Sequence, residues 1–491
     1  MRFLWLFVVC VGVAWGANPA EVRKARREFE DAFSKYGKLL KKRRPKPAEL
    51  RRAAAKLKAA IRKLASLNDP KAVKVLLTNC LNHKKFWVVR YTYEAVKANT
   101  TSESAQDEVA RFAMRQREED LRYVMARMCV GWKSRQVGRF FERLADGRGW
   151  RLKVLAAKGL AFFKTGSARG RLERLLRDKH LSVRLAAAAS LLALGYPKEK
   201  IPKLLRETPF VDGPFLPKRV LTQRLIIIID ASNPMNTKMA LTQDEIAERL
   251  KELQKRQKEE RRPKGNQKKQ QKQDKEEFYK QHFVVTRFEF AKLKVRKLIQ
   301  SLPKEMEVRL LFVSGSVEEF GRKGEAIRLS DKDILRKFWQ WYERRTTYPG
   351  RDLVAAFRRA FDDPVADTVI LITCGGPDKS EIDDYEEFLR WFRQRNFYRG
   401  LRVHVAELVA DFGAAGLTQP EQVARQEQID RITSFLSKLA QAGEGRFTAV
   451  SHIGKVAIPS GKPEKKPPEK KKPQKEEPSK SAPNPKKEEK K

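Results

Sequence analysis

The sequence has few of the side chains with which enzymes carry out catalysis. Its 491 residues include only four cysteines and five histidines. No glycine-rich phosphate loop, no His-Glu-x-x-His motif and no nucleophile elbow is present. We therefore expect a protein that is not an enzyme, with no catalytic residues and no cofactor. The histidines are scattered along the chain, at His83, His180, His282, His404 and His452.

Cysteine is too sparse for a disulfide framework, so stability must come from burial. Cys80 and Cys129 lie among apolar residues of helical pattern, and we interpret them as buried thiols. A Cys80–Cys129 disulfide is the alternative in an oxidising compartment. Cys374 follows one predicted strand and His404 lies in another that could be its neighbour, so the two could form a thiol–imidazole pair. Neither has an evident orienting partner, so we interpret both as ordinary strand-end residues.

Long apolar runs are absent after the first residues. The apolar run at 3–13 follows Arg2 and precedes Ala14-Trp15-Gly16, so residues 1–17 predict a cleavable signal peptide. This run is shorter than the roughly 20 residues that a membrane-spanning helix needs. We therefore predict an exported protein, periplasmic, in the cell envelope or secreted, with no integral membrane span in the mature chain.

Acidic residues are far outnumbered by basic ones. The chain has 61 Asp and Glu against 106 Lys and Arg, a formal net charge of +45. Such a charge attracts polyanions, which makes an anionic polymer one candidate partner. Residues 236–284 are rich in Lys, Arg, Glu and Gln without an apolar face, which predicts an inserted charged segment, helical or disordered. Lysine and proline dominate 456–491, which predicts a disordered tail.

Residues 18–206 have a helical pattern throughout. The stretch 21–60 predicts a basic helical hairpin. Beyond it, basic residues that each lead a mostly apolar helix recur at spacings of 32, 31 and 31 residues, at Arg90, Arg122, Lys153 and Arg184. A period near thirty with two helices per unit is typical of an α-solenoid. The last unit, DKHLSVRLAAAASLLALG, resembles a HEAT repeat, and a proline-containing linker at 207–222 follows.

Residues 223–455 alternate between apolar runs and helical stretches, which predicts a doubly wound α/β domain. The expected strands are 225–230, 308–313, 368–373, 403–408 and 446–450. The expected helices are 286–301, 331–343, 352–361, 382–396 and 425–442. Ligands of such sheets bind beyond the carboxyl ends of the strands, so the residues after 230 and 373 are the first candidates for a site.

The segment after the first predicted strand reads Asp230-Ala231-Ser232-Asn233-Pro234-Met235. It resembles the metal-ion-dependent adhesion motif of von Willebrand factor A domains, Asp-x-Ser-x-Ser-Met. Residues 350–353 resemble the Gly-Thr-Asx-Leu loop of that family, and 372–377 resemble its Leu-Thr-Asp-Gly-x-Pro segment. The resemblance covers about 240 residues and implies an A-like fold. It also implies that a divalent cation would bind at the positions of Asp230, Ser232, Pro234, Arg351 and Cys374.

Three of these five positions no longer suit a hard cation, which prefers oxygen ligands. Pro234 has no side-chain oxygen, Arg351 carries a positive charge, and Cys374 offers a soft sulfur. We therefore expect a degenerate site without metal. Magnesium remains an alternative only if other oxygens substitute for the lost ligands. The candidates for such substitution are Thr347, Asp352 and Asp378.

An arginine in place of a metal ligand suggests a second role for this position. A guanidinium stays charged at neutral pH and can hold a carboxylate through two parallel hydrogen bonds. We predict that Arg351 pairs with Asp230 and stands in for the cation, with the Ser232 hydroxyl joining. The alternative is that Arg351 points into solvent.

These features together favour a non-catalytic interaction or scaffold protein with a protein partner. The helical repeats would offer an extended surface, and the A-like domain would offer a metal-free rim of loops. One alternative is a polyanion-binding protein that uses the insertion and tail on nucleic acid or acidic polysaccharide. A second alternative, a metal-dependent adhesion protein, requires the cation site that the substitutions argue against.

Overall fold

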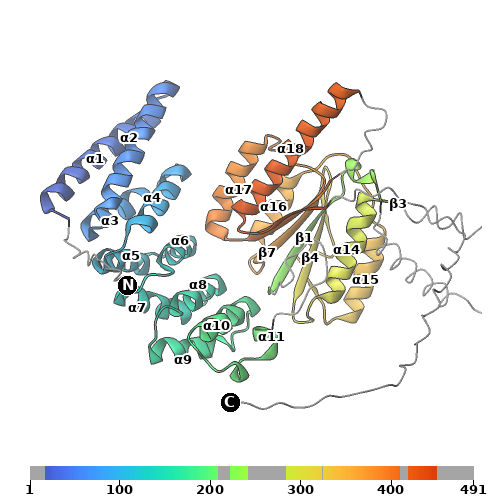
Figure 1. The fold of residues 1–491 in the computed structure, drawn as a ribbon, viewed down its shortest axis with the longest axis horizontal. Coiled ribbons are helices and arrows are strands. Elements are labelled where there is room, and N and C mark those ends of the chain that lie inside the picture. The colour runs from blue at the N-terminus through green and yellow to red at the C-terminus, as the bar shows by residue number, and fades with distance from the viewer. Residues whose placement is uncertain (1–16, 208–221, 241–283, 323, 410–417, 451–491) are drawn as a thin grey trace, which may run out of the picture. The chain divides into compact units, whose positions relative to one another are not determined.

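A helical region is followed by an α/β region in the computed structural model (Figure 1). The structure describes residues 17–207, 222–240, 284–322, 324–409 and 418–450. Nearly all of the predicted signal peptide, most of the linker and insertion, and the tail lie outside the described residues. The expectation of helices first and an α/β domain second is confirmed.

Two long helices open the chain, α1 (Pro19–Lys41) and α2 (Pro47–Ser66), and they pack against each other as the predicted hairpin. Each begins with a proline in its first turn, where a missing N–H costs no hydrogen bond. The side chain of Asn18 accepts from the backbone N–H of Ala20 and caps α1. Phe29 and Ile61 are among the side chains buried in these two helices.

Eight shorter helices follow and stack in two rows. Their bounds are α3 (Pro70–Cys80), α4 (Phe86–Asn99), α5 (Glu103–Arg115), α6 (Glu119–Cys129), α7 (Arg135–Ala145), α8 (Trp150–Leu160), α9 (Gly166–Leu175) and α10 (Leu181–Ala193). The odd-numbered helices contact one another in order, and so do the even-numbered ones, and α3–α4, α5–α6, α7–α8 and α9–α10 also pack together as pairs. A short 3-10 turn (Lys198–Lys200) and α11 (Lys203–Arg206) end the helical region.

The 31-to-32-residue register of the sequence corresponds to matching positions in the even-numbered helices. The residue three places after each repeated basic residue is buried on its helix. These residues are Tyr93, Met125, Ala156 and Ala187, each 9% exposed or less. A repeated buried face is what lets neighbouring units share one core.

The α/β region is built on a sheet whose strand order is β5-β4-β1-β7-β8-β9, with β6 also paired to β4. The five strands from β4 to β9 in this order run parallel, whereas β5 and β6 pair antiparallel with β4. Strand bounds are β1 (Arg224–Asp230), β4 (Glu307–Val313), β5 (Val317–Glu319), β6 (Ile327–Arg328), β7 (Thr368–Thr373), β8 (Arg402–Leu408) and β9 (Phe447–Val450). Because β1 lies inside the sheet, its isoleucines are buried on both faces.

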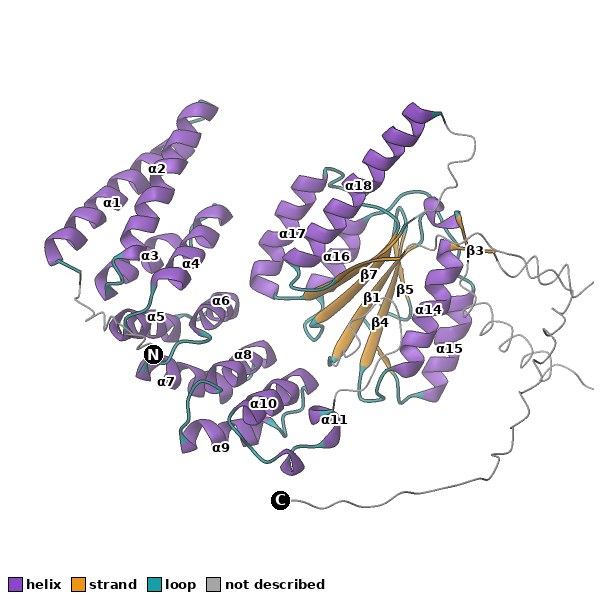
Figure 2. Cartoon of the chain, viewed as in Figure 1, coloured by secondary structure: helices purple, strands orange, loops and turns teal. Residues whose placement is uncertain are grey.

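Helices cover both faces of this sheet (Figure 2). On one face, α14 (Arg287–Ser301) and α15 (Lys332–Glu343) bring Phe288 and Tyr342 against Phe312 of β4. On the other face, α16 (Leu353–Asp362), α17 (Tyr385–Arg399) and α18 (Gln419–Ala442) share a core with β1, β4, β7 and β8. The sheet is therefore doubly wound, as the alternating sequence predicts.

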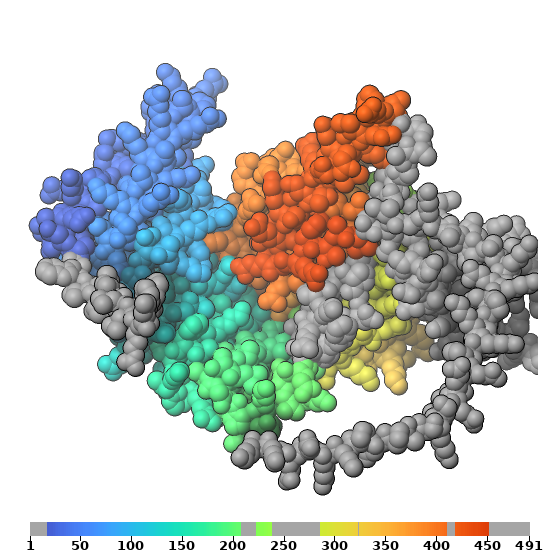
Figure 3. All heavy atoms as spheres, in the orientation of Figure 1, coloured from blue at the N-terminus to red at the C-terminus, as the bar shows by residue number. Residues whose placement is uncertain are grey.

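The helical region contacts the amino-end edge of the sheet. Trp150 Nε1 donates to the carbonyl of Pro364 (2.8 Å), and Ser182 is hydrogen-bonded to Asp367, just before β7. Next to β1, the side chain of Gln223 accepts from the backbone N–H of Leu181 (2.8 Å). In Figure 3 the surfaces of the helical region (blue to green) and of α17 (orange) meet directly.

Four short strands of the structure are not among the predicted elements. The edge strands β5 and β6 are two or three residues long and partly polar, so they lack the apolar runs that identify β1 and β7. The strands β2 (Lys238–Ala240) and β3 (Val284–Thr286) pair at the two ends of the predicted insertion. A 3-10 turn also covers Asn233–Asn236. The first and last residues of the 236–284 segment therefore belong to ordered elements.

Two expectations about the chain as a whole can be compared with the described residues. Cys80, Cys129 and Cys374 are free thiols, and the first two are buried as predicted, so the alternative Cys80–Cys129 disulfide is not formed. Within the part of the chain that the structure describes, no helix combines the length and apolarity needed to cross a bilayer.

Candidate functional site

The candidate site lies at the carboxyl-end edge of the sheet, where β1 ends in Asp230. Two backbone hydrogen bonds hold the segment that follows. The N–H of Ala231 donates to the carbonyl of Val313 (2.7 Å), and the N–H of Tyr348 donates to the carbonyl of Ala231 (2.8 Å). The Ser232 N–H donates to Asp230 Oδ1 (2.8 Å), which turns the chain back over the strand end.

Arg351 lies in the centre of the site, and its side chain is bonded on every nitrogen. Its Nε donates to Asp230 Oδ2 at 2.6 Å. Its two terminal nitrogens donate to the carbonyl of Gly376 (2.6 Å) and to Ser232 Oγ (3.0 Å). Arg351 is 6% exposed, while Asp230 and Ser232 are fully buried. The structure therefore brings these residues together, and Arg351 does not point into solvent.

The end of β7 supplies further hydrogen-bond donors to Asp230. Thr373 Oγ1 donates to Asp230 Oδ2 (2.8 Å), and the backbone N–H of Cys374 donates to the same oxygen (3.2 Å). The Cys374 sulfur lies 3.3 Å from a terminal nitrogen of Arg351. Because every oxygen of this buried carboxylate has donors, its burial is compensated without a cation.

Two glycines make room for the arginine. Gly350 has a φ of +84°, the left-handed region that glycine adopts without strain, and it turns the chain into Arg351. A Cβ atom at Gly375 would lie 2.5 Å from a terminal nitrogen of Arg351. Any larger residue at 375 would therefore displace the guanidinium. The backbone of Arg351 also pairs with that of Asp378, which fixes the loop on which it stands.

The electrostatics of the site favour a charged arginine and a neutral thiol. Burial is the largest single influence on Arg351 and lowers its pKa, but the charge and hydrogen bond of Asp230 together with smaller contributions outweigh it, so the pKa of Arg351 is raised. Burial, reinforced by the nearby Asp230 carboxylate, raises the pKa of Cys374 to about 12. A thiol with so high a pKa is not a nucleophile at neutral pH.

A second buried arginine, Arg287 at the start of α14, approaches the same site. One of its terminal nitrogens donates to the carbonyl of Pro234 at 3.4 Å. Its pKa is lowered, chiefly by burial, although the negative charge of Asp230 acts in the opposite direction. The site thus has a second guanidinium group, and Arg287 interacts electrostatically with the carboxylates of Asp230 and Glu407.

These residues do not fit a divalent cation. The guanidinium of Arg351 contacts Asp230 and Ser232, the two surviving positions of the motif. A cation there would meet a positive charge at close range, which is strongly unfavourable in a buried site. Among the described residues, no group of three or more His, Cys, Asp or Glu side chains is arranged to hold a metal ion.

The residues considered as substitute ligands have other partners. Asn236 donates to Thr347 Oγ1 at 2.6 Å. The Asp352 carboxylate caps α16 by accepting from the Ala355 N–H (3.0 Å), and it also accepts from Ser380 Oγ (2.8 Å). Asp378 is exposed, and its backbone pairs with that of Arg351. Pro234, at the motif position without a side-chain oxygen, is exposed as well.

Cys374 and His404 do not meet. In the β7–β8 register, His404 is opposite Ile370, four residues before Cys374. His404 Nδ1 instead accepts from the N–H of Arg446 at 3.0 Å. Cys374 directly follows the end of β7, as interpreted, whereas His404 is the third residue of β8 and lies inside the strand.

Sequence reasoning missed three contributors to the site, Thr373, Gly376 and Arg287. Thr373 and Gly376 stand inside the segment that resembles the A-domain motif, so their proximity follows from the alignment. Their bonds do not, because the family motif does not specify how a buried arginine would be held. Arg287 carried no signal, since it is one of many basic residues in its stretch.

Comparisons with known proteins give no family assignment. No protein-family model matches the chain, and no curated protein matches it. Among solved structures, the chain is similar to an aerotolerance-related membrane protein from Bacteroides fragilis, at 14% sequence identity and a TM-score of 0.26. The similarity covers 47% of this chain and 92% of that chain. This likeness is too distant to carry an argument about function.

Proposed function

We propose that the chain is a non-catalytic interaction protein whose A-like domain binds a protein partner without a metal ion. The observation that carries the proposal is the buried contact of Arg351 with Asp230 and Ser232. In an A-like domain with a complete adhesion motif, binding would depend on the cation. With a guanidinium in that place, recognition must come from the surrounding loops.

The rim of loops around the site offers a suitable anchor in Tyr348. This residue is 51% exposed, although it directly adjoins the buried Ser232. Its backbone is fixed on both sides, by its own N–H to Ala231 and by its carbonyl, which accepts from Asn233 (3.1 Å). Exposed aromatic side chains on a rigid backbone are typical anchors of protein interfaces.

The helical region supports a scaffold role. Its contacts with the α/β region lie at the amino-end edge of the sheet, whereas the rim lies at the carboxyl-end edge. We infer a HEAT-like solenoid from the 31-to-32-residue register and the two rows of helices. In this arrangement the rim stays accessible while the helices provide a second surface.

Capture of the partner tests the proposal. The full chain is used as bait in an envelope extract of the source cells, in EDTA and at high salt, with quantitative mass spectrometry. We expect Tyr348→Ala to lose partners that the wild type and Phe162→Ala retain. Phe162 is a matched control because it is exposed to a similar extent, 44%, on the helical region.

Three results would contradict this proposal. Capture that requires magnesium would favour the metal-dependent adhesion protein. Capture that disappears at high salt, or when 241–283 and 451–491 are deleted, would favour the polyanion-binding protein. Equal capture by both alanine variants would show that the rim is not the binding surface.

We further propose that the protein is exported, on the strength of residues 1–17. N-terminal sequencing of the native protein should find a chain that begins near Ala17 in a non-cytoplasmic fraction. An intact Met1 on a cytoplasmic protein would contradict export.

A further inference from the structure

A second candidate site lies where the helical region meets the α/β region, at the edge of the sheet opposite Arg351. A partly open cavity of about 940 Å³ lies here. It is lined on one side by α4, α6, α8 and α10, and on the other side by α17, β8 and the turn that precedes β9. This volume is within the range of small-molecule sites, roughly 300–1,000 Å³.

The cavity is strongly basic. Seven of its lining residues are Lys or Arg and three are acidic. Four of the basic side chains have partners that account for their charge or their hydrogen bonds. Arg127 pairs with Glu444, Arg90 pairs with Glu94, and Arg151 and Arg399 donate to backbone carbonyls.

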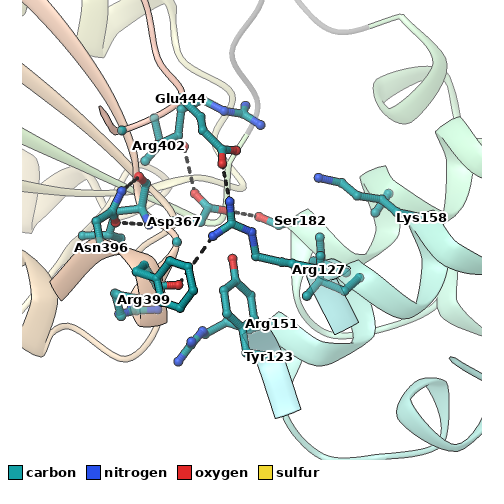
Figure 4. A pocket seen from close by; sticks show the side chains of 18 of the residues that line it. Tyr123, Arg127, Arg151, Lys158, Ser182, Asp367, Asn396, Arg399, Arg402 and Glu444 are labelled. Atoms are coloured by element: carbon teal, nitrogen blue, oxygen red, sulfur yellow. Dashed lines mark hydrogen bonds and ion pairs between the residues drawn. The ribbon is translucent and has the colours of Figure 1, made fainter. Parts of the chain in front are cut away.

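Three basic side chains of the cavity remain: Lys158 on α8, Arg393 on α17 and Arg402 on β8. None of the three makes a side-chain hydrogen bond or ion pair within the described ranges. Figure 4 shows Lys158 extending from its helix into the cavity, on the side of the Arg127–Glu444 pair. Burial lowers the pKa of Lys158, and the charges of Arg402 and Arg127 lower it further, while the carboxylates of Glu444 and Asp367 act in the opposite direction.

Lys158 and Arg402 are exposed side chains, so solvent screens part of their repulsion and both charges remain available to an anion that enters the cavity. The carboxylates of the cavity compensate these charges only in part. Asp367 is hydrogen-bonded to Ser182 and Thr368, and burial raises its pKa to about 6. Glu444 is largely exposed and already forms an ion pair with Arg127.

Glu444 also has an unusual backbone, with a φ of +51°. Its turn is held against β8, since a Cβ at Gly445 would lie 1.9 Å from the carbonyl oxygen of Val403. Non-glycine residues in this conformation are strained, and such strain is common where a side chain must be positioned for binding. The strained turn sets the Glu444 carboxylate at the mouth of a basic cavity, where it competes with any other anion for Arg127.

We propose that this cavity binds a small organic phosphate, with Lys158, Arg402 and Arg393 as its cationic contacts. A phosphate monoester presents three terminal oxygens, which suits cations supplied by three different elements. The organic part would lie against the apolar lining from α10 and α11, formed by Leu185, Ala186, Ala189 and Leu205. The cavity then joins the two regions of the chain through a shared ligand.

Isothermal titration of the full chain with pyrophosphate at physiological ionic strength tests the proposal. Lys158→Gln should weaken binding by roughly tenfold or more, because a charge-assisted hydrogen bond is lost. Lys164→Gln is the matched control, since Lys164 is an exposed residue beyond the end of α8 and does not line the cavity. Glu444→Gln should strengthen binding, whereas Glu173→Gln, which removes an ion-paired carboxylate from α9, should not.

Stability without ligand gives an independent readout. Lys158→Gln should leave the melting temperature unchanged or raised, because it removes a repelled charge, so loss of binding cannot be ascribed to unfolding. Equal affinity of Lys158→Gln and Lys164→Gln for pyrophosphate would overturn the proposal. AMP should displace pyrophosphate from this site. If a single-stranded RNA displaces it more effectively than AMP does, the site belongs to a polymer and the small-molecule proposal is wrong.

Discussion

At the scale of single residues, the candidate site is organised around an internal ion pair. Asp230 has no exposure, and Arg351 supplies the charge that the carboxylate requires. Such pairs add little stability over an apolar replacement, but removal of one partner is costly because the other charge stays buried and uncompensated. The pair therefore closes the hydrogen-bond network of the site and is not a large source of stability.

Arg351→Ala should lower the free energy of unfolding by roughly 3–5 kcal/mol, since it leaves Asp230 buried without its partner. Arg358→Ala is the control, because Arg358 pairs with Glu381 on the surface, and its loss should matter little. In denaturant unfolding, the double variant Asp230→Ala, Arg351→Ala should be far less destabilised than the sum of the two single variants. Strict additivity would mean that the two side chains do not interact.

Cys374 should be unreactive in the folded protein. With its pKa raised to about 12 by burial, it carries almost no thiolate at pH 8, and Cys80 has a pKa raised to about 12 for the same reason. Iodoacetamide at pH 8 should label neither residue until the protein is unfolded in guanidinium chloride, as read by peptide mass spectrometry. Rapid labelling of native Cys374 would contradict the described environment.

The sequence was sufficient to predict which residues gather at this site but not how they bond. Asp230, Ser232, Arg351 and Cys374 stand at positions of a known motif, so their proximity follows from strand order. The role of Gly375 depends on the path of the Arg351 side chain. That path is set by tertiary packing, which no spacing in the sequence encodes.

At the scale of elements, tight packing between helices depends on small residues at contact points. Gly159 on α8 is one such point, since a Cβ there would lie 2.3 Å from the Phe141 ring of α7. Gly170 on α9 is also helical, but nothing lies within 4 Å of the position of its Cβ. Substitution of Gly159 therefore tests helix packing, and substitution of Gly170 tests helix propensity alone.

Gly159→Ala should destabilise the protein by about 1–3 kcal/mol through overpacking. Gly170→Ala should stabilise it by about 0.5–1 kcal/mol, because alanine loses less backbone entropy in a helix. Calorimetry on the two variants measures both effects. A stabilised Gly159→Ala variant would contradict the described packing of α7 on α8.

The strand β8 carries a buried histidine that must stay neutral. Burial lowers the pKa of His404 from 6.5 to about 4, and the charges of Arg402 and Arg446 contribute. Between these two pH values the unfolded chain binds more protons than the folded one, so stability is lost as the pH falls from about 6.5 to about 4.

Asparagine at 404 keeps an acceptor for the Arg446 N–H but cannot become charged. His404→Asn should therefore lose less stability than the wild type between pH 6.5 and pH 4, as measured by urea unfolding. His83→Asn is the control, because His83 also accepts a backbone N–H but is only half-buried. An unchanged pH slope in His404→Asn would mean that His404 titrates normally in the folded protein.

The long elements were predictable because their apolar runs are strong, as in β1 and β7, whose bounds match the expected strands to within a residue. Helix α18 begins at Gln419, six residues earlier than expected, because its first turns are polar and carry no apolar periodicity. The strands β5 and β6 are defined by pairing with β4 and not by their own sequence.

At the scale of the whole molecule, the helical and α/β regions meet through ring contacts of Phe86 and Tyr93 with Phe397, and through side chains that reach carbonyls and carboxylates across the junction. Trp150 and Pro364 are more than two hundred residues apart, and their contact is a single hydrogen bond. Sequence reasoning could identify each region from its own periodicity. It could not place the junction at the amino-end edge of the sheet, since isolated polar contacts leave no periodic signal.

The melting temperature of the full chain in EDTA, and then in excess magnesium or manganese, tests the central claim most directly. Because Arg351 and not a cation compensates Asp230, we expect the wild-type melting temperature to be the same in all three conditions, and Asp230→Ala to respond no differently. A ligand that binds the folded state must raise the melting temperature. A clear rise in magnesium or manganese that is absent in Asp230→Ala would contradict the account, because it would show that the site binds a metal ion.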